Sequence, residues 1–164
     1  MPVNLELKLK INPKQNTERL IKKISGSRKK ILNQKDIYYK CKNGLLKLRI
    51  ENDDCCLIKY FRDETGTRWS DYEILKLEGR NVEKYLSDIF SVEVIVEKVR
   101  KLYVYKDTRI HLDEVKGLGK FLELETVVTK SKRHAQKEFA LVVKLLNLDL
   151  TKQIKSSYRD LLRK

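Results

Sequence analysis

The sequence lacks the features that mark disulfide-stapled, secreted and membrane proteins. Its three cysteines, Cys41, Cys55 and Cys56, are an odd set without a C-x-x-C spacing, so we expect neither a disulfide framework nor a zinc site. No apolar run approaches the length that spans a membrane, and no signal peptide opens the chain. These absences indicate no membrane partner and make the reducing cytoplasm the expected compartment.

Motifs that read nucleic-acid sequence are also missing: there is no helix-turn-helix, zinc-finger or RNP-type pattern. The net charge is nevertheless +14, and most of the surplus lies in residues 14–30 and 130–164, which we expect to be helices with basic outer faces. Such a surface could bind nucleic acid through phosphate contacts, or it could reflect a lysine-rich proteome. Of the two explanations we favour the lysine-rich proteome.

The length and composition are those of a soluble globular protein. The chain has 164 residues, of which 41% are hydrophobic and 37% are charged. This length is enough to bury a core and is typical of one domain. We therefore expect residues 1–164 to form a single domain.

What the sequence does have is a regular alternation of charged and apolar residues. It is clearest between residues 109 and 125, where two alternating runs are joined by a glycine-containing turn. Side chains on a strand switch faces at every residue, so the ionisable groups share one face of a predicted hairpin. These groups are Arg109, His111, Asp113, Glu123 and Glu125. Two carboxylates two residues apart on a strand are placed to hold a divalent cation.

The same alternation recurs in residues 4–10, 45–51 and 97–103. A further run, 57–62, is ambiguous in phase, and we favour the phase that puts Tyr60 and Arg62 on the charged face. That face then carries four carboxylates, Glu6, Asp113, Glu123 and Glu125. It also carries seven cations: Lys8, Lys47, Arg49, Arg62, Lys98, Arg100 and Arg109.

A plain wet face of an antiparallel sheet is the simplest explanation for any single alternating strand. Several such strands together favour a binding face. A face that is merely exposed to solvent needs no separation of acidic from basic residues, and Thr, Ser or Gln would serve there equally well. Here the acids gather on the first strand and the last two, apart from most cations. Cations around a small acidic cluster suit a polyphosphate bound with Mg²⁺ or Mn²⁺.

The order of elements predicts a barrel. Strands are expected near 3–11, 36–41, 45–51, 55–62, 68–77, 92–105, 107–115 and 120–130, and helices near 14–26, 81–90, 131–147 and 150–163. Closing eight strands into a barrel removes their exposed edges. The predicted fold class is α+β: an eight-stranded antiparallel closed β-barrel with a charged interior, flanked by helices.

At this point the sequence resembles the CYTH superfamily, the triphosphate tunnel metalloenzymes. The resemblance covers nearly the whole chain and rests on several segments: Asn4-Leu-Glu-Leu-Lys8, Gly44–Arg49, Glu97–Arg100, Arg109–Gly119, Phe121–Glu125 and Ser157–Leu162. The superfamily includes class IV adenylyl cyclases, thiamine triphosphatases and inorganic triphosphatases. The last segment is similar to bacterial class IV cyclase-like proteins. The resemblance implies an antiparallel eight-stranded tunnel.

The resemblance also implies a reaction: metal-dependent cyclisation or hydrolysis of a nucleoside triphosphate or another triphosphate. Mg²⁺ or Mn²⁺ would be held by Glu6, Glu123 and Glu125, with Asp113 as a further ligand or as a support to one. The seven cations named above would bind phosphates, and four of them would act on the transferring group: Lys8, Arg49, Lys98 and Arg100.

One departure from the family pattern is Asn4, which stands where the Glu-x-Glu-x-Lys motif has its first Glu. Asn offers a carbonyl oxygen but no negative charge, which implies a weaker or altered metal site. The alternative is therefore a non-catalytic nucleotide- or polyphosphate-binding protein. An RNA 5′-triphosphate is a further possible substrate, guided by the basic helices. The resemblance is compatible with a monomer or a homodimer.

Several residues keep a second interpretation. Lys98 and Arg100 could belong to a structural ion network with Glu6 or Glu123. His111 could act as an acid or base, although a hydrogen-bonding role in the lining is the simpler expectation. The strand aromatics, Trp69 and Tyr72, could touch a nucleobase or could serve only for packing.

Overall fold

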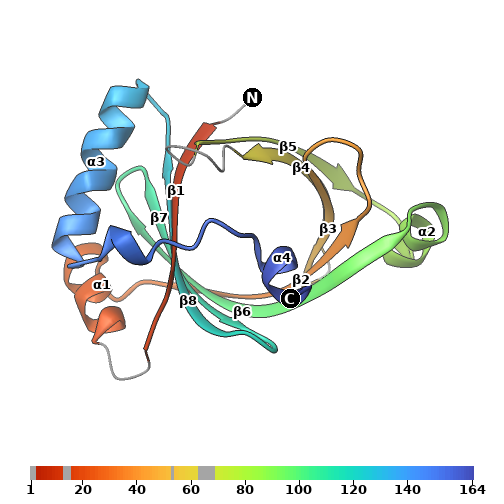
Figure 1. Cartoon of the computed structure of the whole chain (residues 1–164), viewed down its shortest axis with the longest axis horizontal. Helices are drawn as coiled ribbons and strands as arrows, with labels where there is room; N and C mark the ends of the chain where they lie inside the picture. Colours follow the sequence, from red (N-terminus) through yellow and green to blue (C-terminus); the bar gives the residue numbers. More distant parts are fainter. Residues whose placement is uncertain (1–2, 13–15, 53, 63–68) are drawn as a thin grey trace.

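The computed structural model describes residues 3–12, 16–52, 54–62 and 69–164. Eight antiparallel strands close into a barrel in the order β1-β5-β4-β3-β2-β6-β7-β8 (Figure 1). The strands are β1 (Val3–Lys10), β2 (Lys30–Tyr39), β3 (Leu45–Glu51), β4 (Asp54–Arg62), β5 (Trp69–Leu77), β6 (Val92–Tyr105), β7 (Thr108–Val115) and β8 (Gly119–Val127). The helices are α1 (Thr17–Ser25), α2 (Val82–Ile89), α3 (Lys132–Leu145) and α4 (Tyr158–Leu162), with a 3-10 turn, η1, at Leu150–Lys152. The predicted fold class is confirmed.

Alternation along each strand separates two compartments. On β1, Leu7 faces outward and packs in a buried cluster with Leu124 of β8 and Ile21 of α1. Its neighbours point into the barrel, where Glu6 lies opposite Glu125 in the strand register. The apolar cluster under α1 and α3 therefore lies outside the barrel. The inside holds the charged faces together with a second buried apolar cluster that includes Tyr60, Phe121 and Tyr158.

Helix α2 covers a second part of the outer surface. Its Leu86 packs in a buried cluster with Ile37 and Tyr39 of β2 and with Leu48 of β3. In Figure 1 this helix lies at the far end of the molecule from α1 and α3. Among the described helices, none combines the length and the apolar character needed to cross a membrane.

The chain after α3 differs from the prediction of one helix over 150–163. It forms η1, then an extended segment, then the short helix α4. The extended segment follows β1, because the backbone N–H of Ile154 donates to the carbonyl oxygen of Lys8 at 2.8 Å. A capping box between Ser157 and Asp160 then starts α4. The hydrogen bond to β1 and the capping box therefore explain why the helix predicted over 150–163 begins only at Tyr158.

Strand β2 begins at Lys30, although the sequence predicted a strand only from residue 36. The added residues pair with β6, from Lys30 opposite Leu102 to Lys35 opposite Glu97. Most of them are exposed or half-buried, so their hydrophobic pattern carries little strand signal. The long partner strand decides their conformation.

Candidate active site

The inside of the barrel is a cavity onto which most of the predicted site residues converge. The predicted residues that line it are Glu6, Lys8, Lys47, Arg49, Lys98, Arg100, Arg109, Glu123 and Glu125. They come from β1, β3, β6, β7 and β8. Tyr60 lines the same cavity, in agreement with the phase favoured for its strand.

Two predicted site residues, Asp113 and Arg62, are not among the described residues that line the cavity. Asp113 is buried behind them. Arg62 lies on β4 opposite Ser70, but its side chain falls outside the described part of the chain. Trp69 pairs with Leu5 on the outward side of β1, so it faces away from the cavity, whereas Tyr72 lines it.

A buried carboxylate that the sequence did not single out organises three of the cations. Both oxygens of Asp36 accept hydrogen bonds from Arg49, each at 2.7 Å, and Lys47 Nζ donates to Oδ2 at 2.8 Å. Lys98 Nζ lies 3.6 Å from the same oxygen. One carboxylate facing three cations leaves a local excess of positive charge, which suits a polyanion.

The pKa values in this cluster follow from burial and charge. Burial by itself would raise the pKa of Asp36, but Arg49, Lys47 and Lys98 hold that pKa well below its usual value. Burial, followed by repulsion from Arg49 and Lys98, lowers the pKa of Lys47 to about 7 despite its contact with Asp36. Asp36 is thus ionised at neutral pH, and Lys47 is poised to gain a proton when an anion arrives.

Asp36 was missed because only the strand register shows its role. It is the first residue of the segment that the sequence predicted as a strand, and it lies opposite Arg49 in the β2–β3 pair. A carboxylate directly opposite an arginine is a favourable cross-strand pair. The available sequence signal was alternation: Asp36 and Tyr38 are two residues apart on a strand and so share a face, and the structure shows Tyr38 lining the cavity.

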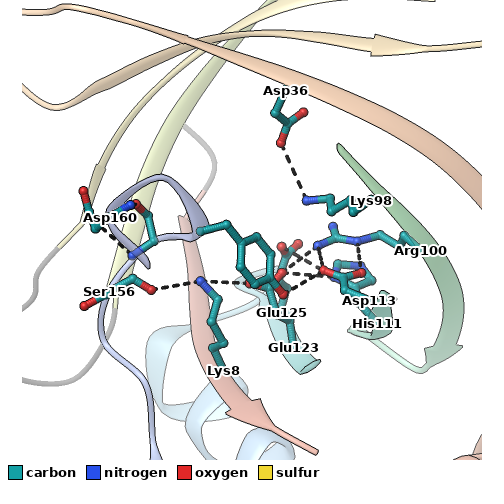
Figure 2. A network of polar contacts seen from close by, with 12 residues as sticks. Lys8, Asp36, Lys98, Arg100, His111, Asp113, Glu123, Glu125, Ser156 and Asp160 are labelled. Atoms are coloured by element: carbon teal, nitrogen blue, oxygen red, sulfur yellow. Dashed lines mark hydrogen bonds and ion pairs between the residues drawn. The ribbon is translucent and has the colours of Figure 1, made fainter. Parts of the chain in front are cut away.

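Arg100 lies at the centre of a second network, shown in Figure 2. Its Nε and Nη2 donate to the two oxygens of Asp113 at 2.7 and 2.6 Å, and Nη2 also donates to Glu123 Oε2 at 2.6 Å. The hydroxyl of Tyr158 donates to Asp113 Oδ2 at 2.9 Å. Asp113 is thus engaged by Arg100 and Tyr158, and the arginine is held in one orientation.

Tyr158 brings the C-terminal segment into the site, a role that the sequence did not suggest. Lys8 Nζ lies 4.1 Å from the centre of its ring, within range of a cation–π contact. The same nitrogen donates to the carbonyl oxygen of Ser156 at 3.0 Å and lies 3.2 Å from Glu123 Oε1. Helix α4 is fastened to the barrel by an ion pair of 3.2 Å between Arg159 and Glu93 of β6.

Among the described residues, two groups could hold a divalent cation, and the one at the tunnel consists of His111, Glu123 and Glu125. One ligand atom from each lies within 4.8 Å of the others. Nδ1 of His111 is 3.7 Å from Glu125 Oε1 and 4.0 Å from Glu123 Oε2. Within the described part of the chain, this buried nitrogen has no hydrogen-bond partner. Burial and repulsion from Arg100 lower the pKa of His111 to about 4, so the imidazole is neutral at pH 7.

These three groups fit a divalent metal. Burial acts to raise the pKa of Glu123, but Lys8 and Arg100 bring it well below its usual value, so this carboxylate is ionised. A neutral imidazole and ionised carboxylates are the forms that bind cations. The sequence did not put His111 among the ligands, although its place on the same face as Asp113 and Arg109 was visible.

Asn4 and Glu6 extend this group along β1. Glu6 lies directly opposite Glu125, and Asn4 lines the cavity two residues away. Asn4 is 3% exposed, and its Oδ1 finds no hydrogen-bond partner among the described residues. A buried carbonyl oxygen without a donor is costly unless a ligand satisfies it.

Comparison with known proteins places this arrangement in a family. The CYTH domain model matches residues 3–158. A provisionally named adenylate cyclase of Methanocaldococcus jannaschii is 28% identical, with the alignment covering 97% of this chain and 98% of that protein. Among solved structures, a protein of Pyrococcus horikoshii aligns with a TM-score of 0.81 at 21% identity, over 96% of this chain and 98% of its own.

A more distant structure has the same fold. A provisionally named adenylyl cyclase of Hippeastrum, which shows a dominant triphosphatase activity, aligns with a TM-score of 0.68 at 15% identity. The alignment covers 99% of this chain and 95% of that one. With a family match over almost its whole length and a closed tunnel of eight strands, the chain belongs to the CYTH family.

Proposed function

We propose that this protein is a metal-dependent enzyme that hydrolyses the terminal phosphate of a triphosphate inside the tunnel. The observation that carries the proposal is the excess of cations around Asp36, facing the same cavity as the ionised carboxylates of Glu123 and Glu125. A polyphosphate and a divalent cation together neutralise both sets of charges. The activity described for the Hippeastrum protein supports the choice of reaction.

The cations of the tunnel would bind the phosphate chain. Lys47, Arg49 and Lys98 are held around one carboxylate, so their remaining N–H groups are oriented before a ligand arrives. Arg100 is fixed by Asp113, and Arg109 lines the cavity near Glu125, its Nε 3.5 Å from Glu125 Oε2. Preorganised cations of this kind stabilise charge that develops during phosphoryl transfer.

Hydrolysis joins a water oxygen to the terminal phosphorus and breaks the bridging P–O bond, with release of one proton. Negative charge grows on the departing diphosphate, where Lys8, Arg49, Lys98 and Arg100 would stabilise it. A bound Mg²⁺ or Mn²⁺ supplies further neutralisation and a more acidic water. Glu6, Glu123, Glu125 and His111 are the residues that would hold this ion, and Asp113 would position Arg100 instead of binding metal.

Cyclisation of ATP is the second candidate, supported by the provisional name of the Methanocaldococcus relative. In that reaction the ribose 3′ oxygen attacks the α-phosphorus and pyrophosphate leaves. The same cations serve both reactions, and the position of the phosphates relative to the acidic cluster decides between them.

A product assay separates these reactions. Purified protein is incubated with Mg²⁺ or Mn²⁺ and with ATP, GTP, tripolyphosphate or thiamine triphosphate, and phosphate, pyrophosphate and cyclic nucleotide are measured together. We expect phosphate without cyclic nucleotide, and a Glu123→Gln/Glu125→Gln variant should be inactive. Cyclic AMP with pyrophosphate would identify a cyclase, and tight binding without any product would leave a capture protein.

A further inference from the structure

Among the described residues that line the tunnel, those of β4 and β5 include no charged side chain. Four side chains on the adjacent strands β4 and β5 form two cross-strand pairs, Tyr60 with Tyr72 and Ile58 with Ile74. All four line the same cavity as the cations. We call this surface the aromatic–aliphatic wall.

Ile58 and Tyr60 are buried and belong to an apolar cluster against which Tyr72 packs, so the exposed part of the wall is Ile74 with one side of Tyr72. Ile74 is 51% exposed, and it belongs to none of the buried apolar clusters formed by the described residues. Tyr72 is half-buried beside it. Exposed apolar surface costs free energy in water, so such a surface inside a charged cavity suits a ligand that covers it.

The wall lies across the barrel from the cations of β6 and β7 that line the cavity. In the strand order, β4 and β5 are on the opposite side from β6 and β7, which carry Lys98, Arg100 and Arg109 (Figure 1). At its edge the wall meets the cation cluster directly, because Ile58 lies opposite Lys47 in the β3–β4 register. Lys47 Nζ also lies 5.5 Å from the centre of the Tyr60 ring.

This two-sided cavity points to a two-part ligand. A phosphate chain would contact the cations, and a flat apolar group would lie against Tyr72 and Ile74. An inorganic polyphosphate has no group that could contact the wall. Tyrosine rings can stack on many flat heterocycles, because stacking does not require a particular pattern of hydrogen-bond donors and acceptors.

We propose that the site takes an organic triphosphate, one that carries a flat heterocycle, in preference to inorganic tripolyphosphate. This inference rests on the proposed function of the tunnel and assigns its substrate class. A nucleobase and the heterocycles of thiamine share this chemistry, so both kinds of triphosphate are tested.

The test measures binding by calorimetry without added divalent cations, so that turnover does not interfere. The probes are ATP, GTP, thiamine triphosphate and inorganic tripolyphosphate at equal ionic strength. Tripolyphosphate carries at least as much negative charge as the organic compounds, so charge alone would favour it. We expect at least one organic triphosphate to bind about tenfold more tightly, as stacking on aromatic side chains predicts.

A double variant, Tyr72→Thr/Ile74→Thr, removes the wall while keeping residues that favour strands. It should weaken binding of the preferred organic triphosphate by about tenfold and leave tripolyphosphate binding nearly unchanged. Retained tripolyphosphate binding also shows that the barrel is folded. The matched control is Leu75→Thr, which changes a neighbouring apolar residue, 62% exposed, on the outer face of β5 and should alter neither affinity.

The outcomes distinguish the two proposals. If tripolyphosphate binds as tightly as every organic compound, or if the double variant weakens all probes equally, the substrate assignment is overturned and the proposed function stands. If the wild-type protein binds no triphosphate of either kind and also forms no product with Mg²⁺ or Mn²⁺, the proposed function fails and the assignment fails with it. Product formed with Mg²⁺ or Mn²⁺ from tripolyphosphate but from no organic triphosphate would overturn the assignment alone. Comparison of ATP and GTP with thiamine triphosphate identifies which heterocycle the wall accepts.

Discussion

At the scale of single residues, Asp36 is the most consequential side chain in the tunnel. It is 1% exposed and contacts Lys47, Arg49 and Lys98. Its carboxylate lets three cations share a small volume in the free protein. Loss of that negative charge should therefore lower the free energy of unfolding, whether or not a substrate is present.

We expect Asp36→Asn to lower the free energy of unfolding by about 3–5 kcal/mol, the range for removing one partner of a buried ion pair. Chemical denaturation followed by circular dichroism measures this change. Asp71→Asn, at an exposed position on β5, is the control and should change stability by less than about 0.5 kcal/mol. Equal stability of the two variants would contradict the proposed role of Asp36.

The proposed role of His111 as a metal ligand rests on its Nδ1, which has no hydrogen-bond partner among the described residues. If Nδ1 binds the metal together with Glu123 and Glu125, His111→Gln should weaken Mn²⁺ binding by about tenfold or more. Electron paramagnetic resonance of free Mn²⁺ measures this affinity without any turnover. Glu114→Gln, exposed on the outer face of β7, should leave Mn²⁺ binding unchanged. Unaltered affinity in the His111 variant would exclude the imidazole as a ligand.

At the scale of elements, the short helix α4 matters more than its length suggests. It is too short to be stable alone. Its Ser157–Asp160 capping box, its Arg159–Glu93 ion pair and its buried Tyr158 fasten it to the barrel. Through Tyr158 this helix also supports the orientation of Arg100, because both residues donate to Asp113.

Tyr158→Phe removes only the hydroxyl of this contact. Hydrogen bonds to charged groups contribute about 1.5–3 kcal/mol, so we expect a loss of stability near the lower end of that range, since Arg100 still satisfies Asp113. Because Arg100 is proposed to stabilise the charge on the departing diphosphate, kcat should fall while KM changes little. Tyr85→Phe on α2, which is exposed, is the control for both measurements. Unchanged stability and kcat would show that the hydroxyl is dispensable.

At the scale of the whole molecule, the barrel concentrates positive charge in its interior as well as on its surface. The net charge is +14, and burial with repulsion from Arg49 lowers the pKa of Lys47 to about 7. A bound anion would raise that pKa, so binding and protonation of Lys47 are linked. In the free protein Lys47 is about half protonated at its pKa of about 7, is mostly protonated one pH unit lower and is mostly neutral one unit higher.

Tripolyphosphate affinity should therefore fall as the pH rises from about 6 to 9, and part of this fall should depend on Lys47. Lys47→Arg keeps its charge throughout this range, so its affinity should decline less steeply than that of the wild type. The protonation of tripolyphosphate itself changes with pH in the same way for the wild type and for Lys47→Arg. The difference between their slopes of affinity against pH therefore reports the protonation of Lys47 alone. Calorimetric titrations at several pH values measure it, and parallel slopes would contradict the linkage.

The sequence by itself determined the strands and their faces. Alternation at a period of two residues assigned Glu6, Lys8, Lys98 and Glu123 to one compartment before any contact was known, and the structure brings them to one cavity. Closure of eight strands followed from the need to remove exposed edges. These predictions succeeded because the pleat of a strand is a local property of the chain.

Only the tertiary structure decided which groups meet across the tunnel. The pairing of Asp36 with Arg49, the entry of Tyr158 from the far end of the chain and the unpartnered nitrogen of His111 depend on strand register and on packing of distant segments. The early start of β2 and the break before α4 depend on partners in the same way. Periodicity tells which face a side chain occupies, but closure of the barrel determines what it faces.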